Sequence, residues 1–575
     1  MKNAEIARAF DELAALYELD GAVVYRVLAY RNAAKAIRDS GVSVAELARQ
    51  GRAEELAGVG KTIAEKIDAL LEEGEIPSAS KLKERIPAGL IEITRIPGLG
   101  PKRTRVLHEA IGVETLDELR AAAEDGRLRD VPGFGAKAEE NVLQALAAGA
   151  DGKPKPRVLL SQALEVGERL VESLREHPAA IRAELAGSAR RMADTCKDLD
   201  IVAAATDPRA LADAFCDLPW LDEASSPGEG GARAVTHHGI PVDLRIVPEQ
   251  NFGNLLQHFT GSGRHNEALR TAAVKRGLHV SEYGVADDES GQTHACATEA
   301  EVYELLGMQY IEPELREDRG ELEAAREGRL PELIRLEDLR GDLHMHTTAS
   351  DGRNTAVEMA RAARARGLDY IAITDHSASH GFGNHVTPEE LERQIDRAAK
   401  ASAKVKGITV LAGSEVNVLP DGSLDYDDVL LERLDWIVAS LHTSFRMGER
   451  EMTERMIRAM EHPLVDAIGH PTGRLIGRRE PYALDIDAVI DAAARTGTFL
   501  EINANPNRRD LPETYARAAA AKGVKLVVDS DAHGADTLEK LRFGVATARR
   551  AWLTREDVAN TLPWSGLSKL RKRAR

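Results

Sequence analysis

The residues best suited to bind metal ions follow residue 339, where histidines and carboxylates end short apolar segments. His344 and His346 are separated by one residue, so both side chains can point to one face of a strand. Asp531 and His533 have the same spacing. Imidazole suits Zn²⁺, Mn²⁺ or Fe²⁺, so the pattern predicts a multinuclear site that activates water for phosphoester hydrolysis. The candidate ligands are His344, His346, Asp351, His376, Glu415, His442, His470, Asp531 and His533.

A structural role is the alternative for these histidines, because single histidines often end strands without binding a metal. That alternative does not readily explain why nearly every strand predicted in this region ends in a ligand residue type. His380, His385 and His462 fall outside the pattern and are interpreted as surface or supporting groups.

A second group of candidate metal ligands lies in the middle of the chain. Asp198 and Asp200 point to the same face if they lie on a strand, and Asp243 follows in a later segment with similar apolar neighbours. Neighbouring carboxylates repel one another unless a divalent cation lies between them. Aspartates on adjacent strands can hold a pair of Mg²⁺ or Mn²⁺ ions, which supports an in-line displacement at a phosphate.

Residues that suit a triphosphate precede these aspartates. Gly187 and Ser188 form a predicted turn that can approach a phosphate closely, and Arg191 follows it. An isolated Asp-x-Asp sequence is most often a solvated strand edge. The combination of the turn, the Asp-x-Asp sequence and the later Asp243 instead favours nucleotidyl transfer.

Three Gly-x-Gly turns recur before residue 155, each with a basic residue close behind. Predicted helices follow them over residues 63–71, 104–109 and 138–147. Glycine lets backbone N–H groups approach an anion, and the start of the next helix adds a positive dipole. One such turn could simply reverse the chain, whereas three favour contact with the DNA backbone. The residues concerned are Gly58, Gly60, Gly98, Gly100, Lys102, Gly133, Gly135 and Lys137.

The elements that carry these residues differ along the chain. Helical spacing of Ile6, Phe10 and Leu13 predicts a helix from residue 3 to residue 19, and helices continue to about residue 150. The Pro-rich segment 151–156 is predicted to be a hinge. Strands of the middle region are predicted at Leu199–Ala204, Ala232–His237 and Val242–Val247.

The region 339–575 alternates strands and helices, which predicts a parallel α/β barrel related to the eightfold one. The carboxyl ends of such strands converge on one mouth, so ligands that are scattered in sequence would form one cluster. The predicted strands are Gly341–His346, Tyr370–His376, Thr409–Val418, Trp436–His442, Asp466–Pro471, Thr498–Asn503 and Val524–Asp531.

Composition excludes several classes of protein. The 575 residues are 43% hydrophobic, and no stretch approaches the roughly 18 apolar residues of a membrane span. Charges near the start argue against a secretory signal, and the scattered Cys196, Cys216 and Cys296 form neither a disulfide framework nor a thiolate site. The net charge of −18 argues weakly against binding to nucleic acid, but the local motifs carry more weight than this average.

The order of these motifs resembles a family X DNA polymerase, the group typified by DNA polymerase beta, over residues 1 to about 315. The region after 339 resembles the polymerase and histidinol phosphatase (PHP) superfamily. The whole chain is similar to bacterial family X polymerases with a C-terminal PHP domain. This resemblance implies a multidomain α+β polymerase core with helix-hairpin-helix domains, a β-rich palm and a thumb, followed by an α/β (β/α)7 PHP barrel.

The resemblance also assigns residues to roles. Asp198, Asp200 and Asp243 are the implied catalytic metal ligands, with the triphosphate bound by the turn at Gly187, Ser188 and Arg191. A further segment is expected to pack against the incoming nucleotide, and its residues are Gly261, Ser262, Asn266 and Arg270. The segment Ser281–Gly284 resembles the strand that follows. All the PHP ligand positions are occupied by ligand residue types, which implies an active barrel.

The implied domains are a lyase-like helical domain (1–80), fingers (81–155), palm (156–248), thumb (249–311), linker (312–338) and PHP barrel (339–575). Two positions depart from the family pattern. His258 stands where family members commonly carry Tyr, which bears on the exclusion of ribonucleotides. Lys66 matches the Schiff-base lysine of the lyase members, but Thr62 replaces a phosphate-binding lysine, and an ordinary exposed lysine is the alternative for Lys66.

The implied function is gap-filling DNA synthesis in repair, coupled to a metal-dependent 3′–5′ exonuclease that could also cut at abasic sites. The implied cofactors are Mg²⁺ or Mn²⁺ in the palm, and Zn²⁺, Mn²⁺ or both in the barrel. The expected partners are gapped or primer–template DNA and dNTPs, with no membrane, for a cytoplasmic, nucleoid-associated monomer. Two alternatives stay open: a DNA-end phosphoesterase whose polymerase region only positions DNA, and a non-enzymatic DNA-end scaffold.

Replacement of Lys102 and Lys137 with Ala tests the predicted DNA contacts of the Gly-x-Gly turns. On duplex DNA, the slope of log binding constant against log salt concentration should flatten by about 1.8 units, since each lost phosphate contact contributes about 0.9. Fluorescence anisotropy over a range of salt concentrations measures this slope. A slope equal to that of the unmodified chain would show that these turns do not contact DNA.

Overall fold

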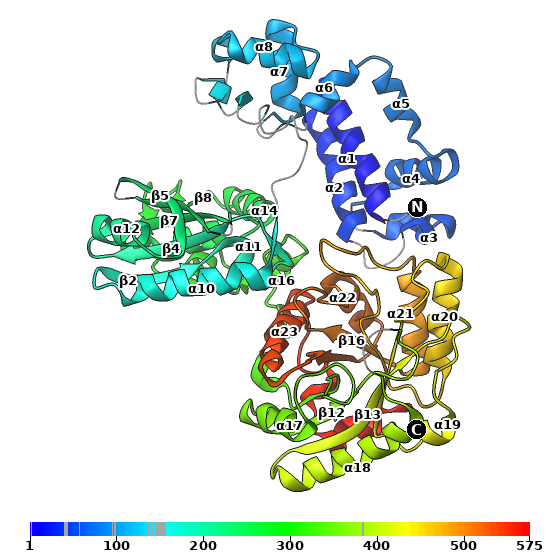
Figure 1. Ribbon diagram of the computed structural model, residues 1–575. Helices are drawn as coiled ribbons and strands as arrows, with labels where there is room; N and C mark the ends of the chain where they lie inside the picture. Colours follow the sequence, from blue (N-terminus) through cyan, green and yellow to red (C-terminus); the bar gives the residue numbers. More distant parts are fainter. Residues whose placement is uncertain are drawn as a thin grey trace. The chain divides into compact units, whose positions relative to one another are not determined.

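The computed structural model describes residues 1, 3–39, 44–56, 58–94, 96, 99–132, 134–135, 138–140, 142–143, 146, 157–228, 230–237, 239–381 and 385–574. The chain forms two compact units, Met1–Pro156 and Arg157–Arg575 (Figure 1). Gly98, Gly133, Lys137 and the segment 151–156 lie outside the described residues. Among the residues described, no helix is long and apolar enough to cross a membrane.

The first unit is helical, and each longer helix buries one apolar face. Ile6, Phe10 and Leu13 of α1 are fully buried, which confirms the helix that their spacing predicted. The described helices are α1 (Asn3–Leu19), α2 (Val24–Asp39), α3 (Val44–Arg49), α4 (Lys61–Glu73), α5 (Pro77–Lys83), α6 (Ala88–Ile93), α7 (Pro101–Ile111) and α8 (Leu116–Glu124).

The second unit begins with a five-stranded sheet of order β2-β4-β7-β6-β5, in which only β4 and β7 are parallel. Side chains of β4 alternate between two cores, with Ile201 on one face and Val202 on the other. Helices therefore cover both faces of this sheet. The elements are β2 (Ala180–Leu185), β4 (Leu199–Ala205), β5 (Leu221–Gly228), β6 (Gly231–Thr236), β7 (Pro241–Val247), α10 (Leu160–Glu176), α12 (Pro208–Cys216) and α13 (Phe252–Thr260).

A small α/β region follows, built on α14 (Gly263–Val274), α15 (Glu299–Leu305) and the hairpin of β8 (Leu278–Ser281) and β9 (Gly284–Asp287). The segment Ser281–Gly284, expected as a strand, is the tight turn of this hairpin, in which Ser281 pairs with Gly284. The charged segment 312–338 contains α16 (Glu321–Arg326) and is packed. Its Leu315 joins the core of this small region, whereas Ile334 joins the barrel core.

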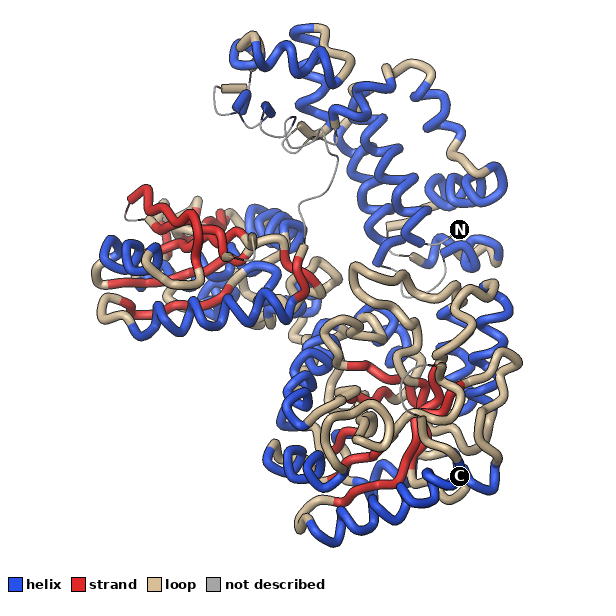
Figure 2. The backbone as a smooth tube through the Cα atoms, viewed as in Figure 1, coloured by secondary structure: helices blue, strands red, loops and turns tan. Residues whose placement is uncertain are grey.

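The last region is a nearly closed parallel barrel in which the seven described strands follow one another in chain order, which confirms the predicted fold class. Figure 2 shows these strands with helices around them. Its strands are β11 (Gly341–Asp342), β12 (Tyr370–Ile373), β13 (Thr409–Asn417), β14 (Trp436–Ser440), β15 (Ala467–Ile468), β16 (Phe499–Asn503) and β17 (Leu526–Asp529). Its helices are α17 (Ala356–Ala365), α18 (Pro388–Lys404), α19 (Asp428–Leu431), α20 (Glu449–Glu461), α21 (Ile486–Thr496), α22 (Glu513–Ala521), α23 (Leu541–Arg550) and α24 (Trp564–Leu567).

Alternate residues of each barrel strand fill two separate cores. On β12, Tyr370 and Ala372 pack inside the barrel, whereas Ile371 and Ile373 pack against the surrounding helices. All the predicted strands exist, but several are shorter than expected because the ligand residues lie in the loops after them. This placement brings the ligands to the mouth of the barrel.

The first and last strands meet through residues beyond their ends. A bridge pairs Met345 with Ala532, and the His346 amide donates to the Ala532 carbonyl at 2.8 Å. Next to this seam, Asp529 accepts from the Leu343 amide at 2.7 Å, and Asp342 accepts from the Ser530 hydroxyl. Burial raises the pKa of both carboxyl groups, and repulsion from Asp342 and Glu501 adds to this effect at Asp529.

Residues near the C-terminus stabilise the opposite end of the barrel. Asp466 is 1% exposed and precedes β15, and it pairs with Arg571 at 2.8 Å and Arg573 at 2.9 Å. The Arg571 guanidinium also lies over the Trp564 ring. These contacts neutralise a carboxylate that burial would otherwise destabilise.

Replacing Arg571 and Arg573 together with Ala should lower the free energy of unfolding of the barrel by about 3 kcal/mol, because Asp466 stays buried without its cationic partners. Urea unfolding followed by tryptophan fluorescence measures the change. The control is Lys569→Ala, which changes an exposed residue of the same segment. Equal unfolding midpoints for the double variant and the control would contradict this role for Asp466.

Candidate active sites

The mouth of the barrel is organised around one buried carboxylate, Glu415, which is 1% exposed on β13. Its Oε1 lies 2.9 Å from His470 Nε2 and 3.1 Å from His442 Nε2. Its Oε2 lies 2.9 Å from His376 Nδ1 and 3.4 Å from His344 Nε2. Imidazoles that follow four other strands therefore converge on this one residue of β13.

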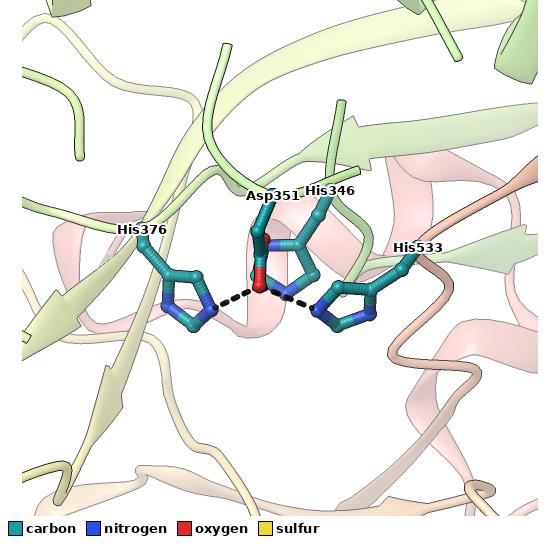
Figure 3. A group of neighbouring side chains, drawn as sticks. All are labelled: His346, Asp351, His376 and His533. Carbon is teal, nitrogen blue, oxygen red and sulfur yellow. Dashed lines mark ion pairs between the residues drawn. The ribbon is translucent and has the colours of Figure 1, made fainter. Parts of the chain in front are cut away.

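Asp351 lies nearer the surface, on the loop after β11, and three histidines surround it (Figure 3). Its Oδ2 lies 3.2 Å from His533 Nε2 and 3.6 Å from His376 Nε2. The third imidazole, that of His346, faces Oδ1 at 3.8 Å. The carboxylate is 27% exposed, so solvent reaches this side of the cluster.

The predicted ligands fall into three overlapping groups, in each of which the ligand atoms lie within 4.8 Å of one another. The groups are His346 with Asp351, His376 and His533; His344 with His346 and Asp531; and His376 with Glu415 and His442. The remaining predicted ligand, His470, contacts Glu415. The structure thus brings all the predicted barrel ligands together.

Side chains that the sequence did not single out hold these ligands in place. Glu501 Oε1 lies 2.6 Å from His344 Nδ1, which turns the other ring nitrogen of His344 toward Asp531 and Glu415. Asn503 donates to Asp531 Oδ2 at 3.1 Å. Such supporting hydrogen bonds fix the orientation of imidazole and carboxylate ligands. The sequence could have indicated both residues, because side chains two positions apart on a strand lie on the same face, and Glu501 and Asn503 have this spacing within an apolar strand.

Charges in the cluster are strongly coupled. Burial alone would lower the pKa of His376, but Glu415 and Asp351 outweigh it and raise the value to about 10. Burial and the neighbouring His376 and His533 lower the pKa of His346 to about 3. Burial opposes ionisation of Glu415, yet the surrounding histidines hold its pKa well below the usual range. The carboxylates are therefore anionic, and the site suits cations.

The donor set fits divalent metal ions. Among the residues described, His344 Nε2, both ring nitrogens of His346 and Glu415 Oε2 are buried with no hydrogen-bond partner. Buried polar atoms without partners are costly, and a coordinated cation would satisfy them. The mixture of imidazole and carboxylate donors suits Zn²⁺, Mn²⁺ or Fe²⁺ better than Mg²⁺.

A second cluster of carboxylates lies on the five-stranded sheet. Asp200 of β4 is the direct neighbour of Asp243 on β7, and Asp198 immediately precedes β4 on the same face as Asp200. Asp243 pairs with Arg245 at 3.1 Å. Burial, together with the charges of Asp198 and Asp243, raises the pKa of Asp200 to about 6. This all-oxygen set suits Mg²⁺ or Mn²⁺.

The predicted triphosphate turn lies against these carboxylates. Gly187 has a φ of +60°, and a Cβ atom on it would lie 2.2 Å from Asp200 Oδ2, so only glycine fits this position. The Arg191 guanidinium contacts Glu317 at 2.9 Å and donates to the Thr260 carbonyl at 2.9 Å. The neighbouring Arg190 pairs with Glu299 at 2.7 Å. These contacts fix both arginines beside the turn.

The segment predicted to face the nucleotide spans the end of α13 and the start of α14. Ser262 caps α14 by accepting from the His265 amide. Asn266 donates to the His258 carbonyl at 2.6 Å, and Gln257 donates to its side-chain oxygen at 3.1 Å. Arg270 is exposed on the same helix, and Gly261 is half-buried between the two helices.

The Gly-x-Gly turns share one local structure where they are described. Gly60 and Gly100 directly precede α4 and α7, and the Gly135 carbonyl accepts from the amide of Ala138. The central residues Val59, Leu99 and Phe134 are buried, which anchors each turn. Lys102 is exposed, Gly58 is exposed with a φ of +87°, and Lys66 is half-buried on α4.

Profiles of known families match most of the chain in separate segments. A helix-hairpin-helix domain matches residues 1–76, and a SAM-like helix-hairpin-helix tandem matches residues 90–148. A DNA polymerase beta thumb matches residues 255–317, and a PHP domain matches residues 342–505.

Relatives of the chain include one that matches nearly its whole length and others that match about a third of it. The chain is 37% identical over 562 residues, 97% of each chain, to "DNA polymerase/3'-5' exonuclease PolX" of Bacillus subtilis (strain 168). It is 34% identical over 239 residues, 38% of this chain and 89% of the relative, to a "Probable phosphatase" of Thermoanaerobacter sp. (strain X514). A "Probable phosphatase" of Acetivibrio thermocellus is 34% identical over 209 residues, 33% of this chain and 78% of that relative.

Mg²⁺ binding to the Asp198, Asp200 and Asp243 cluster should weaken as the pH falls. Because the pKa of Asp200 is raised to about 6, a proton competes with the ion near and below that pH, and the apparent affinity should fall about fourfold between pH 7.5 and pH 5.5. Isothermal titration between about pH 7.5 and pH 5.5 measures this affinity, with Asp200→Asn identifying the heat that comes from this cluster. A constant affinity across this range would contradict the raised pKa.

Proposed function

The chain belongs to the family X DNA polymerases that carry a C-terminal PHP domain, and we propose that it fills gaps in DNA during repair and trims 3′ ends with a nuclease in the barrel. As a member of this family it is a DNA polymerase with 3′–5′ exonuclease activity. Two groups of potential metal ligands support the finer proposal: Asp200 beside Asp243 on neighbouring strands with Asp198 next to β4, and the histidines and carboxylates gathered around Glu415 at the mouth of the barrel.

In the polymerase site, Asp198, Asp200 and Asp243 would hold Mg²⁺ or Mn²⁺, which when bound activates the primer 3′-hydroxyl and neutralises charge on the leaving pyrophosphate. The chain's own residues bind and orient the nucleotide. Gly187 leaves room beside Asp200, and Arg191 lies next to it with its guanidinium fixed by Glu317. Ser188 contacts the triphosphate in this proposal.

The α13–α14 segment supplies the remaining nucleotide contacts in this proposal. Asn266 faces the minor-groove edge of the nucleotide, while Gly261, Ser262 and Arg270 pack around the new base pair. The position of Asn266 is fixed by its hydrogen bonds to His258 and Gln257. The substrates are dNTPs on gapped or primer–template DNA, which the Gly-x-Gly turns hold by its backbone.

In the nuclease site, the barrel ligands would hold Zn²⁺, Mn²⁺ or both, which when bound activate water and neutralise the charge of the scissile phosphate. Glu415, which has a histidine against each of its two oxygens, would help to hold these ions. Glu501 and Asn503 keep His344 and Asp531 in position. Arg508 lies 3.9 Å from Asp531 and adds positive charge beside the cluster.

Further aspects of the proposal rest on the family resemblance. Lys66 on α4 is the candidate nucleophile of a 5′-deoxyribose phosphate lyase, and the barrel also acts on abasic sites or blocked 3′ ends. The protein works as a monomer on DNA in the cytoplasm, associated with the nucleoid.

The two activities should separate by mutation. Asp198→Ala should abolish primer extension on gapped DNA while DNA degradation continues, because Asp198 belongs only to the palm cluster. His344→Ala should lower the rate of 3′–5′ degradation by at least about a hundredfold, which is the size of effect expected when residues that support a metal site are lost. Primer extension with Mg²⁺ should persist in this variant. Gel assays with and without dNTPs measure both activities on one labelled primer.

Matched controls are available on the same domains. Asp213→Ala changes a surface aspartate of α12, and His462→Ala changes a barrel histidine that contacts Asp428 outside the cluster. After chelation, added Mn²⁺ or Zn²⁺ should restore degradation by the unmodified protein but not by His344→Ala. Extension by Asp198→Ala would refute the palm assignment, and undiminished degradation by His344→Ala would refute the barrel assignment.

A further inference from the structure

The barrel makes direct contacts with the loop that follows the triphosphate turn. Arg550 of α23 donates to the Arg191 carbonyl at 2.7 Å. Arg509, on the loop after β16, donates to the Met192 carbonyl at 2.8 Å and pairs with Asp194 at 3.1 Å. The loop 191–194 lies in the chain between Ser188 and Asp198, so these contacts fall between the proposed triphosphate and metal positions.

A buried ion-pair network extends this contact to the Arg191 side chain. Glu317 accepts from the Arg191 Nε at 2.9 Å and from the Arg550 Nη1 at 3.0 Å. The other terminal nitrogen of Arg550 contacts Glu513 at 3.1 Å. Burial opposes ionisation of Glu317, but Arg550 and Arg191 hold its pKa below the usual range. A barrel arginine thus helps to orient the proposed triphosphate-binding arginine.

The contact does more than pack one region against another. Apolar packing between the barrel and the five-stranded sheet comes from another residue of α23, Phe543, which is buried in the core of that sheet. Arg509 and Arg550 instead bond to backbone carbonyls, which fixes the conformation of the loop itself. Met192 has a φ of +53°, a region that residues other than glycine rarely adopt, and the Arg509 bond to its carbonyl helps to hold it there.

We propose that the PHP barrel is a structural part of the polymerase's triphosphate site, with Arg550 and Arg509 as positioning residues for the loop 191–194. The inference rests on the proposed function, in which Arg191 binds the triphosphate. A shift of a binding group by about 1 Å strongly weakens the contribution that this group makes to holding the substrate. Loss of a barrel arginine should therefore impair nucleotide binding although the nuclease ligands remain intact.

The test compares two arginines on the same barrel helix in the full-length protein. Arg550→Ala should raise the KM for dNTP in gap filling by about tenfold with kcat changed little, the pattern of lost binding rather than lost chemistry. Arg550→Lys should fall between Arg550→Ala and the unmodified protein. Arg542→Ala is the control, since Arg542 pairs with Glu168 on α10 and does not contact the loop. Its KM should stay unchanged.

Nuclease activity and thermal unfolding of the same preparations distinguish positioning from general support of the fold. Positioning predicts nearly unchanged 3′–5′ degradation in Arg550→Ala. A parallel loss of extension and degradation, or a dNTP KM equal to that of the control, would overturn the inference. If Arg550→Ala does not fold, Glu317→Gln serves instead. This change keeps the shape of the side chain but removes the negative charge between Arg191 and Arg550. The KM for dNTP of Glu317→Gln should rise about threefold.

Failure of the proposed function gives a different result from failure of this inference. Arg191→Ala should itself raise the dNTP KM if Arg191 binds the triphosphate. An unchanged KM in Arg191→Ala would remove the premise and overturn both proposals. A raised KM in Arg191→Ala with an unchanged KM in both Arg550→Ala and Glu317→Gln would overturn only the role of the barrel.

Discussion

The buried carboxylate of Glu415 is the constraint on which the barrel site depends. An ionised carboxylate in a protein interior costs several kcal/mol unless cations or hydrogen bonds compensate it. Five histidines that follow four different strands contact Glu415 through its two oxygens. In a barrel of parallel strands, the loops that follow the strands all begin at the same end, which brings these histidines together. The barrel fold therefore supplies the histidines that compensate the charge of the buried Glu415 carboxylate.

The palm cluster follows a different electrostatic principle. Asp243 pairs with Arg245, and repulsion from Asp198 and Asp243 adds to burial in raising the pKa of Asp200. In the barrel, by contrast, protonated histidines compensate the carboxylates, and His376 holds its proton with a pKa of about 10. A metal ion bound by the aspartates would relieve repulsion, whereas one bound by the barrel ligands would have to displace protons. We therefore expect the two groups of ligands to differ in metal preference and in response to pH.

Local patterns in the sequence predicted most of the site, because the ligands obey local rules. The His344–His346 spacing and the apolar segments between ligands require only the periodicity of strands and the convergence of barrel ends. The predicted strands were too long because apolar residues continue past the last residue of the regular strand, as Met345 does after β11. Glu501 could have been found from its strand face, but its partner His344 lies far away in the chain.

The contacts of α23 could not be predicted in this way. Arg550 and Glu317 are 233 residues apart, and nothing in either local sequence indicates the other. Leu541, Val545 and Ala548 face the barrel core at helical spacing, while Phe543 joins the palm core on another face. A barrel standing alone would expose Phe543 to water and leave Arg550 without Glu317. The residues of α23 thus suit a barrel that packs against the five-stranded sheet, and this helix is a structural element that the two regions share.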